Sequence, residues 1–265
     1  MPINLDQTTQ AFLGLNAQWG VEQYLFGCQA NDLEHSRKSD KVPADGFGQP
    51  VKNSLPGQQE ASLKVKGMAV LDRGQINWQM HQWAGRKSPV NAWFALEGLQ
   101  ALQPATFQPS TIMDHSVTAK LKDPVDVTWE LDARGAYYDG TILLSPQTLL
   151  TGPSGTGSLD LNPLNGITGA TPTATTTGGA VALHVWAFDG GTAPTVTVTV
   201  QHSPDGVTYT NLAVFNTFST LGSQLIKLPN PTTINPYVQA IWTATGTPTD
   251  VQVLCMFART PNLSL

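Results

Sequence analysis

The sequence is poor in cysteine and has no long apolar run. Its two cysteines, Cys28 and Cys255, are far apart in a chain of 265 residues, so no disulfide framework is expected and a reducing compartment is the default. No segment approaches the roughly 18 apolar residues of a membrane-spanning helix. The N-terminal stretch MPINLDQTTQ lacks the basic and apolar regions of a signal peptide. These features predict a soluble protein that is made in a cytoplasm and has no membrane span.

Positive charge is also scarce. The chain has 14 Lys and Arg against 19 Asp and Glu, and its net charge is −5. A protein that grips nucleic acid by its phosphates needs a basic patch, so this class is disfavoured. Within residues 161–265 there are only two basic and three acidic side chains. The second half of the chain is therefore almost neutral.

Motifs of catalysis and metal binding are missing. None of the five histidines stands at metal-ligand spacing from a cysteine or a second histidine. The stretch from Gly152 to Ser158 has the outline of a phosphate-binding loop, but Ser158 stands where that motif needs a lysine. No Gly-x-Ser-x-Gly nucleophile motif occurs. The sequence therefore predicts no catalytic, cofactor-binding or metal-binding residue, and no cofactor.

The most regular pattern in the chain lies in Val125–Ser145. Apolar residues alternate strictly with polar ones in its first half, as in a half-buried β-strand. Val125, Val127, Trp129 and Leu131 share one face; Asp126, Thr128, Glu130 and Asp132 share the other. Bend residues and a second short apolar run follow. The stretch predicts a strand with one face in a core and a row of carboxylates on the other.

Pattern and composition also predict the structure of the segments before this strand. Residues 10–30 predict one or two strands. Residues 31–60 begin with charges and continue with glycine and proline, which is typical of a long loop. Residues 60–72 alternate like a strand, and residues 75–83 continue in β style.

One helix is predicted, over residues 89–103. Ser88 is a good N-cap, Pro89 suits the first helical position, and Pro104 ends the segment. Ala92, Leu96, Leu99 and Leu102 recur at spacings of four, three and three, as on one face of a helix.

The second half of the chain has short Val- and Thr-rich runs separated by turns. Residues 151–180 are rich in Gly, Pro, Thr and Ser and predict a linker. At Pro204-Asp205-Gly206 a tight turn is expected, because Gly supplies a positive φ. The predicted strands are Val181–Phe188, Thr195–His202, Thr208–Phe215, Gln224–Leu228, Tyr237–Thr243 and Val251–Arg259. Their spacing favours one antiparallel β-sandwich.

Two side-chain sets leave more than one interpretation. The carboxylates Asp126, Glu130 and Asp132 suit a solvated strand face, and they could also supply an acid–base pair. Tryptophans in this chain suit core positions, although Trp186 or Trp242 could stack on a sugar in the second domain.

The order of these elements resembles the major tail tube protein of long-tailed phages. The resemblance is carried by the polar stretch 31–60 ending in Leu55-Pro56-Gly57-Gln58, the strand Ala61–Leu71, the short helix and Val125–Ser145 with its bend from Gly135 to Gly140. The stretches VTVTVQHSPDGVTYTNLAVF and Tyr237–Gly246 are similar to β-sandwich domains appended to phage tail subunits. Each motif is weak alone, and their order is more specific.

The resemblance implies a mainly β (α+β) fold in two domains. Residues 1–155 would form a tail tube β-sandwich or barrel with one helix, 156–178 a linker, and 179–265 an antiparallel β-sandwich, Ig-like or jelly-roll, that decorates the tube. The subunit would be a structural protein of the virion tail, not an enzyme. It would close into rings, usually of six copies, that stack into the conduit for DNA ejection.

The resemblance also implies partners and site residues. Partners would be the protein itself, the tape measure, tail terminator and distal tail proteins, and double-stranded DNA passing through the lumen without tight binding. Assembly would take place in the cytoplasm of the host bacterium. Candidate lumen-facing acids are Asp126, Glu130 and Asp132, and Trp186 and Trp242 are candidate glycan contacts. The candidate contacts between stacked rings are Arg37, Lys38, Asp40, Lys41 and Asp45.

Two other functions compete with this one. A carbohydrate- or host-binding β-sandwich module of a virion or cell surface is the second interpretation, separated from the first by self-assembly. A glycoside hydrolase is the third, and it needs two carboxylates facing each other across a cleft. The acids of Val125–Ser145 instead lie along one strand.

Overall fold

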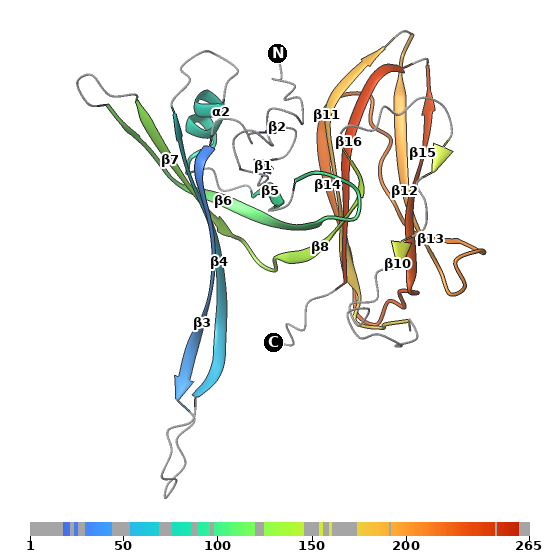
Figure 1. Ribbon diagram of the computed structural model, residues 1–265, viewed down its shortest axis with the longest axis horizontal. Coiled ribbons are helices and arrows are strands. Elements are labelled where there is room, and N and C mark those ends of the chain that lie inside the picture. Colours follow the sequence, from blue (N-terminus) through green and yellow to red (C-terminus); the bar gives the residue numbers. More distant parts are fainter. Residues whose placement is uncertain are drawn as a thin grey trace, which may run out of the picture. The chain divides into compact units, whose positions relative to one another are not determined.

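The computed structural model of the chain is mainly β, and all its described strand pairs are antiparallel (Figure 1). This confirms the fold class predicted from the sequence. The structure describes residues 18–21, 24–25, 30–43, 54–68, 76–85, 89–95, 98–119, 125–145, 154–155, 159–160, 174–190, 192–246 and 248–259. The elements of the first half are β1 (Gln18–Val21), β2 (Tyr24–Leu25), β3 (Ala30–Pro43), β4 (Ser54–Met68), α2 (Ile76–Trp83), β5 (Val90–Ala95), β6 (Pro104–Thr118), β7 (Asp126–Ala133) and β8 (Tyr138–Leu144). Those of the second half are β9 (Ser154–Gly155), β10 (Leu159–Asp160), β11 (Gly179–Gly190), β12 (Thr195–Ser203), β13 (Thr210–Val214), β14 (Gly222–Leu228), β15 (Tyr237–Thr245) and β16 (Pro248–Arg259).

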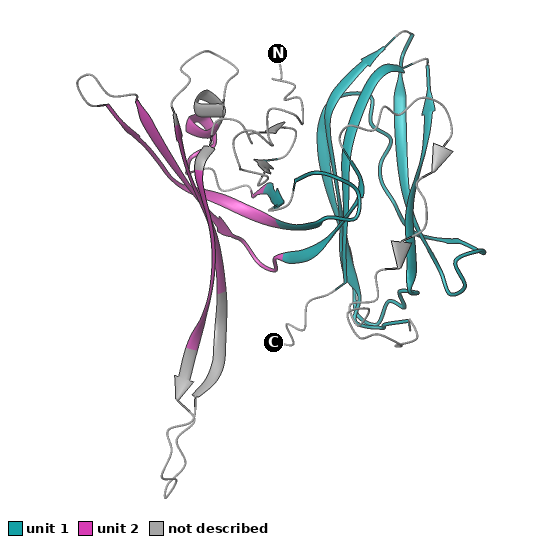
Figure 2. Ribbon diagram, viewed as in Figure 1, with its two compact units in different colours: residues 1–27, 91–107, 138–265 teal, residues 28–90, 108–137 magenta. Residues whose placement is uncertain are grey.

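The chain forms two compact units, and each is assembled from separate stretches of sequence. Unit 1 contains residues 1–27, 91–107 and 138–265, and unit 2 contains residues 28–90 and 108–137 (Figure 2). In unit 1, β8 pairs with the last strand, β16. The linear boundaries predicted near residues 155 and 179 stay a prediction.

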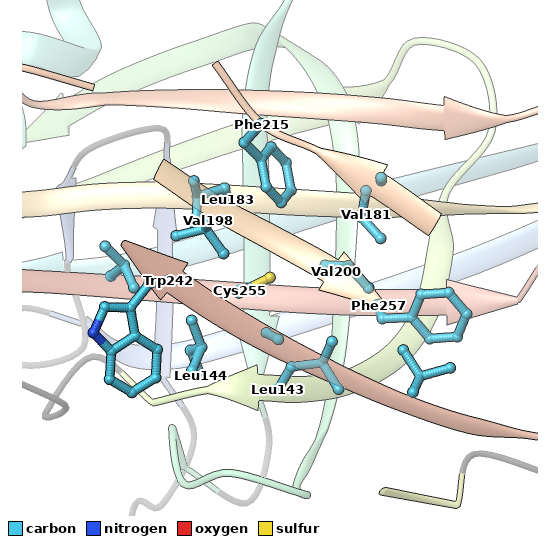
Figure 3. Close-up of a cluster of buried hydrophobic side chains, with 14 of the residues drawn as sticks. Leu143, Leu144, Val181, Leu183, Val198, Val200, Phe215, Trp242, Cys255 and Phe257 are labelled. Carbon is cyan, nitrogen blue, oxygen red and sulfur yellow. The ribbon is translucent and has the colours of Figure 1, made fainter. Parts of the chain in front are cut away.

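Unit 1 is built around a β-sandwich, and the six strands predicted for the second half of the chain all appear in it. One sheet has the order β14-β11-β16-β8, and the facing sheet has the order β10-β15-β12-β13. Strand β12 alternates, with Val196, Val198 and Val200 fully buried and threonines between them. Figure 3 shows Leu183, Val198, Trp242, Cys255 and Phe257 among the side chains of this core.

Strand β11 is buried on both of its faces. Val181, Leu183 and Val185 belong to the sandwich core. On its other face, the ring of Trp186 stacks on Trp93 of β5, with ring centroids 5.9 Å apart. A strand with two buried faces is expected to be a nearly continuous apolar run, and in β11 His184 alone interrupts residues 179–188.

The helix predicted over residues 89–103 is wrong. Residues Val90–Ala95 form strand β5, which pairs with β1. Consecutive residues Ala92, Trp93, Phe94 and Ala95 are all buried, so the segment has two buried faces and no single apolar stripe. A short apolar run with this burial is compatible with either element, and the tertiary environment selected the strand.

The described helix, α2, lies instead at Ile76–Trp83, where a β segment was expected. Met80 is fully buried, whereas the next residues His81 and Gln82 are exposed. The alternation of Ile76, Trp78 and Met80 covers only three positions, too few to separate a period of two from one of 3.6.

The long loop predicted over residues 31–60 is also wrong for its described part. Strands β3 and β4 pair from Ala30↔Gly67 to Pro43↔Ser54, so most of this stretch is a long β-hairpin. Asp32, Glu34 and Lys38 lie on one face of β3, and Leu33, His35 and Arg37 lie on the other. This alternation was hidden by the charge-rich composition. In unit 2, β4 also pairs with β7, and β7 pairs with β6.

The turn predicted at Pro204-Asp205-Gly206 is confirmed. Gly206 has a φ of 73°, and the carboxylate of Asp205 accepts hydrogen bonds from the N–H of Thr208 at 2.8 Å and the hydroxyl of Ser203 at 2.7 Å. These donors, the N–H of Thr208 first, lower the pKa of Asp205 to about 2.

A pH dependence of stability follows from this turn. Because the pKa of Asp205 is lower in the folded protein than its usual 3.8, the carboxylate stabilises the fold above pH 3.8, and this contribution is lost as the pH falls towards 2. We expect Asp205→Asn to flatten the acid limb of a plot of unfolding midpoint against pH. Asp189→Asn, at another exposed position of unit 1, is the matched control. An unchanged acid limb in Asp205→Asn would contradict the assignment.

Candidate functional site: the charged face of unit 2

One face of the unit 2 sheet collects most of the described charges of strands β3, β4, β7 and β6. We call it the charged face. It consists of Asp32, Glu34, Lys38, Glu60, Lys64, Lys66, Asp114, Asp126, Glu130 and Asp132. Cross-strand pairing places these residues on one side, because directly opposed residues in antiparallel strands point to the same face. Seven acids and three lysines give this face a net charge of −4.

The acids and lysines are ordered in rows across the strands. In one row, Glu34, Lys64, Glu130 and Asp114 lie opposite one another on β3, β4, β7 and β6. In the next row, Lys66 forms an ion pair with Asp32 at 3.4 Å, and both side chains are more than half exposed. Exposed pairs of this kind contribute little to stability. The rows therefore contribute more to the electrostatic potential of the surface than to the stability of the fold.

The three acids predicted to share a strand face do so. In β7, Asp126 is exposed and Glu130 and Asp132 are half-buried, while Val127, Trp129 and Leu131 between them are at most 1% exposed. Trp129 and Leu131 belong to the core on the opposite side of the sheet, opposed by Val65 and Leu63 of β4. The apolar alternation thus fixes which way the carboxylates point. That they line a lumen stays a prediction.

Asp132 has an unfavourable environment in the folded protein. Partial burial raises its pKa above the usual 3.8, and the charges of Glu130 and Glu60 raise it further. A raised folded pKa means that the ionised carboxylate costs stability at neutral pH, and that this cost disappears as the pH falls below 3.8.

We therefore expect Asp132→Asn to stabilise unit 2 at pH 7 and to have no stabilising effect at pH 3. Urea unfolding at both pH values measures the difference. Asp126→Asn, on the same face but exposed, is the matched control with a smaller expected effect. A lower midpoint for Asp132→Asn at pH 7 would refute the assignment.

The opposite face of the sheet carries aromatic contacts that sequence reasoning missed. The guanidinium of Arg37 lies 4.5 Å from the ring centroid of Tyr137, and His35 contacts the same ring edge-on. The rings of His81 on α2 and His115 on β6 have centroids 5.4 Å apart. These pairs join residues that are distant in the sequence, and no local sequence pattern predicts them.

The predicted ring-to-ring contacts lie on a strand rather than in a loop. Arg37, Lys38 and Asp40 are exposed on β3, and Lys41 belongs to the same strand. Asp45 lies outside the described residues. Arg37 and Lys38 point to opposite faces of the sheet, because Arg37 contacts Tyr137 while Lys38 is on the charged face. Their role between rings stays a prediction.

Strand β3 has 14 residues and, among the described residues, pairs with β4 as its one strand partner. A long strand at the edge of a sheet is a template on which another chain can add a strand. The charged side chains of β3 oppose unspecific pairing and leave a partner of matched charge as the suitable one.

The tryptophans predicted as glycan contacts are both buried. Trp242 is 7% exposed within the sandwich core, and Trp186 is 6% exposed against Trp93. Stacking on a sugar needs an open ring face, so neither residue is suited to that contact in this structure. The alternative interpretation of these residues as core anchors agrees with their positions.

Two features are absent from the described residues. No group of three or more His, Cys, Asp or Glu side chains there is arranged to hold a metal ion. No helix among those residues is both long and apolar enough to cross a membrane.

Comparison with known proteins gives only distant likenesses. No family model and no curated protein match the chain. A protein of the native gene transfer agent virion is similar over 46% of this chain and 93% of its own, with 9% identity and a TM-score of 0.40. The Dit protein of phage SPP1, described as a hub of the adsorption apparatus, matches over 92% of this chain and 99% of its own, with 8% identity and a TM-score of 0.35. A protein of the phage p2 baseplate matches over 93% and 99%, with 11% identity and a TM-score of 0.34. These solved structures belong to phages and related particles, and at such TM-scores no family assignment follows from them.

Proposed function

We propose that the protein is a structural subunit of a phage-type tail, which closes into rings with copies of itself. Rings of six copies stack into a tube that conducts DNA. The observation that carries this proposal is the sheet face of net charge −4, on which β3 has β4 as its one strand partner among the described residues. The strands at 54–68 and in Val125–Ser145, which belong to the order resembling a tail tube protein, support the same assignment, whereas the loop and the helix of that order do not.

Ring formation would extend the sheet at β3. A neighbouring subunit would add a strand beside β3, and a closed ring leaves no edge strand of this kind. In this arrangement Arg37, Lys38, Asp40, Lys41 and Asp45 are contacts between subunits or stacked rings. The tape measure, terminator and distal tail proteins are the expected further partners.

The charged face would line the lumen in this proposal. Acids repel phosphate, so DNA passes without binding tightly, and a lining of lysines would hold it in place. Asp126, Glu130 and Asp132 are the residues that we assign to this lining. The function is mechanical and electrostatic, and it needs no enzymatic step. The subunit is assembled in the bacterial host and resides in the virion tail.

Negative-stain electron microscopy of the purified full chain tests the proposal. We expect rings that stack into tubes at high protein concentration. Rings that form but do not stack would place the subunit at a tube end rather than along the tube. A chain that stays monomeric at every concentration would refute self-assembly.

A trimmed hairpin tests the role of β3 in assembly. Residues 39–59 are removed, and Lys38 is joined to its partner Glu60 by an Asn-Gly turn, which suits a two-residue hairpin. We expect this variant to fold and to lose ring or tube formation. The control is Asp189→Asn, at an exposed position of unit 1 that has no assigned contact between subunits, and it should keep tube formation. Full-length tubes from the trimmed variant would contradict the role of the hairpin.

A further inference from the structure

Two segments far apart in the sequence are joined at one end of the unit 1 sandwich. Thr175, just ahead of β11, and Ile234, in the connection between β14 and β15, exchange two backbone hydrogen bonds of 2.9 and 2.8 Å. We call residues 229–236 together with Thr175 the latch. Ile234 is fully buried in the sandwich core, so the closed latch also buries apolar surface.

The side chain of Arg259, at the end of β16, ties the latch together. Its Nη1 donates to the hydroxyl of Thr175 at 2.7 Å and to the carbonyl of Ile234 at 3.0 Å. Its Nη2 donates to the carbonyl of Asn235 at 2.7 Å. One guanidinium therefore holds both segments of the latch.

His202 accepts a further hydrogen bond from the latch. The backbone N–H of Asn235 donates to Nδ1 of His202, on β12, at 3.1 Å. Because Nδ1 is the acceptor, the neutral ring must carry its proton on Nε2. Protonation of the imidazole would place a second proton on Nδ1, facing the N–H of Asn235. Two donors would then face each other, and the bond would be lost.

The surroundings of His202 favour its neutral form. Burial lowers its pKa below 6.5, and the positive charge of Arg259 lowers it further. The strands paired with β12, which are β13 and β15, contain no Asp or Glu, and neither does the segment 229–236. Tyr237 is the titratable residue of β15. Asp205, the nearest carboxylate along the chain, is occupied by the N–H groups of its own turn and the hydroxyl of Ser203.

We propose that His202 makes the latch sensitive to pH. Its neutral imidazole keeps residues 229–236 and Thr175 closed on the sandwich, and its protonation opens them while the strands stay folded. Above pH 6.5 the closed state is favoured in full. As the pH falls below 6.5, the open state takes up the proton more readily, and closure is progressively lost. The burial of Ile234 keeps the closed state dominant at neutral pH.

Amide hydrogen exchange of the full chain at pH 7.5 and pH 5 tests the latch. Rates are converted to protection factors, which removes the intrinsic pH dependence of exchange. We expect a several-fold loss of protection at Thr175, Ile234 and Asn235 at pH 5. Amides of Val198 and Ala240, in the paired strands β12 and β15, should keep theirs. Equal latch protection at both pH values would overturn the proposal.

A substitution of His202 separates the protonation of this residue from other effects of acid. His202→Gln can accept the N–H of Asn235 with its side-chain carbonyl but cannot be protonated, so its latch should stay closed at pH 5. His81→Gln, on α2 of unit 2, is the matched control and should keep the full response. A pH response that persists in His202→Gln would refute the role of His202.

A measurement on the unchanged protein covers the case in which His202→Gln does not fold. NMR of the ring protons gives the titration midpoint of His202 directly. The latch predicts that this midpoint coincides with the midpoint of the loss of protection at Asn235. Different midpoints would overturn the proposal.

Discussion

Gly140→Val is expected to destabilise unit 1 by about 3–5 kcal/mol, the range of the most damaging single substitutions. Gly140 lies in β8 where this strand approaches β16. A Cβ at this position would clash with the carbonyl oxygen of Phe257 and would lie 2.9 Å from the Cβ of Ala258. The obstructing atoms belong largely to backbone, which cannot move aside as a side chain can. The two strands would have to separate.

The separation would break a defined part of the sandwich. Strand β8 pairs with β16 at Thr141↔Phe257, Ile142↔Met256 and Leu144↔Cys255, and Leu143 and Leu144 belong to its core. Valine has a high strand propensity, so local preference acts in the opposite direction to the expected effect. A loss of stability would therefore report the close approach of the two backbones.

Denaturant unfolding followed by tryptophan fluorescence and circular dichroism measures this effect. Gly135→Ala is the control, because Gly135 has a φ of 101° and open space around the added Cβ. Its expected cost is the backbone strain alone, about 1–2 kcal/mol. If Gly140→Val unfolded at the denaturant concentration of the unchanged protein, the pairing of β8 with β16 would be refuted.

Replacing Asp126, Glu130 and Asp132 together by lysine is expected to make the assembled protein retain DNA. The charged face would change from seven acids and three lysines to four acids and six lysines, and its net charge from −4 to +2. DNA binding through phosphates falls steeply with salt. We expect DNA retention to rise at least about ten-fold at 50 mM salt and to fall again towards 200 mM.

Co-sedimentation of assembled protein with duplex DNA across a salt series measures the retention. Two controls separate position from net charge. The variant Asp126→Asn/Glu130→Gln/Asp132→Asn removes the acids without adding bases, and a smaller increase is expected. Asp189→Lys/Asp250→Lys adds positive charge to unit 1, and no increase is expected. Equal retention by the triple lysine variant and the unit 1 control would show that the charged face does not meet the DNA.

The errors of sequence interpretation share a physical cause. Val90–Ala95 and Ile76–Trp83 are short segments, and too few positions are available to separate a helical period from a strand period. Burial against β1 and β11 selected a strand for the first segment, through contacts such as Trp93 on Trp186. The hairpin β3–β4 was hidden because charge-rich strands look like loops when their pairing partner is unknown.

The candidate site, too, was predicted from the sequence only in part. The alternation in β7 was sufficient to place Asp126, Glu130 and Asp132 on one face, because a strand with a buried side has only one polar side. The rows that include Lys64, Glu34 and Asp114 depend on the register of four strands, which no single segment encodes. The burial of Trp186 and Trp242 depends likewise on partners from distant strands.

By itself, the sequence determined the mainly β class, the six strands of its second half, the turn at Asp205 and the two faces of β7. These features depend on local periodicity and on backbone preferences, which neighbouring residues contain in full. Only the tertiary structure decided that β8 pairs with β16, that β5 is a strand, and that His202, Asn235 and Arg259 meet at one end of the sandwich. Such contacts arise from packing and hydrogen bonding between distant segments, and local sequence carries no record of which distant segment will supply the partner.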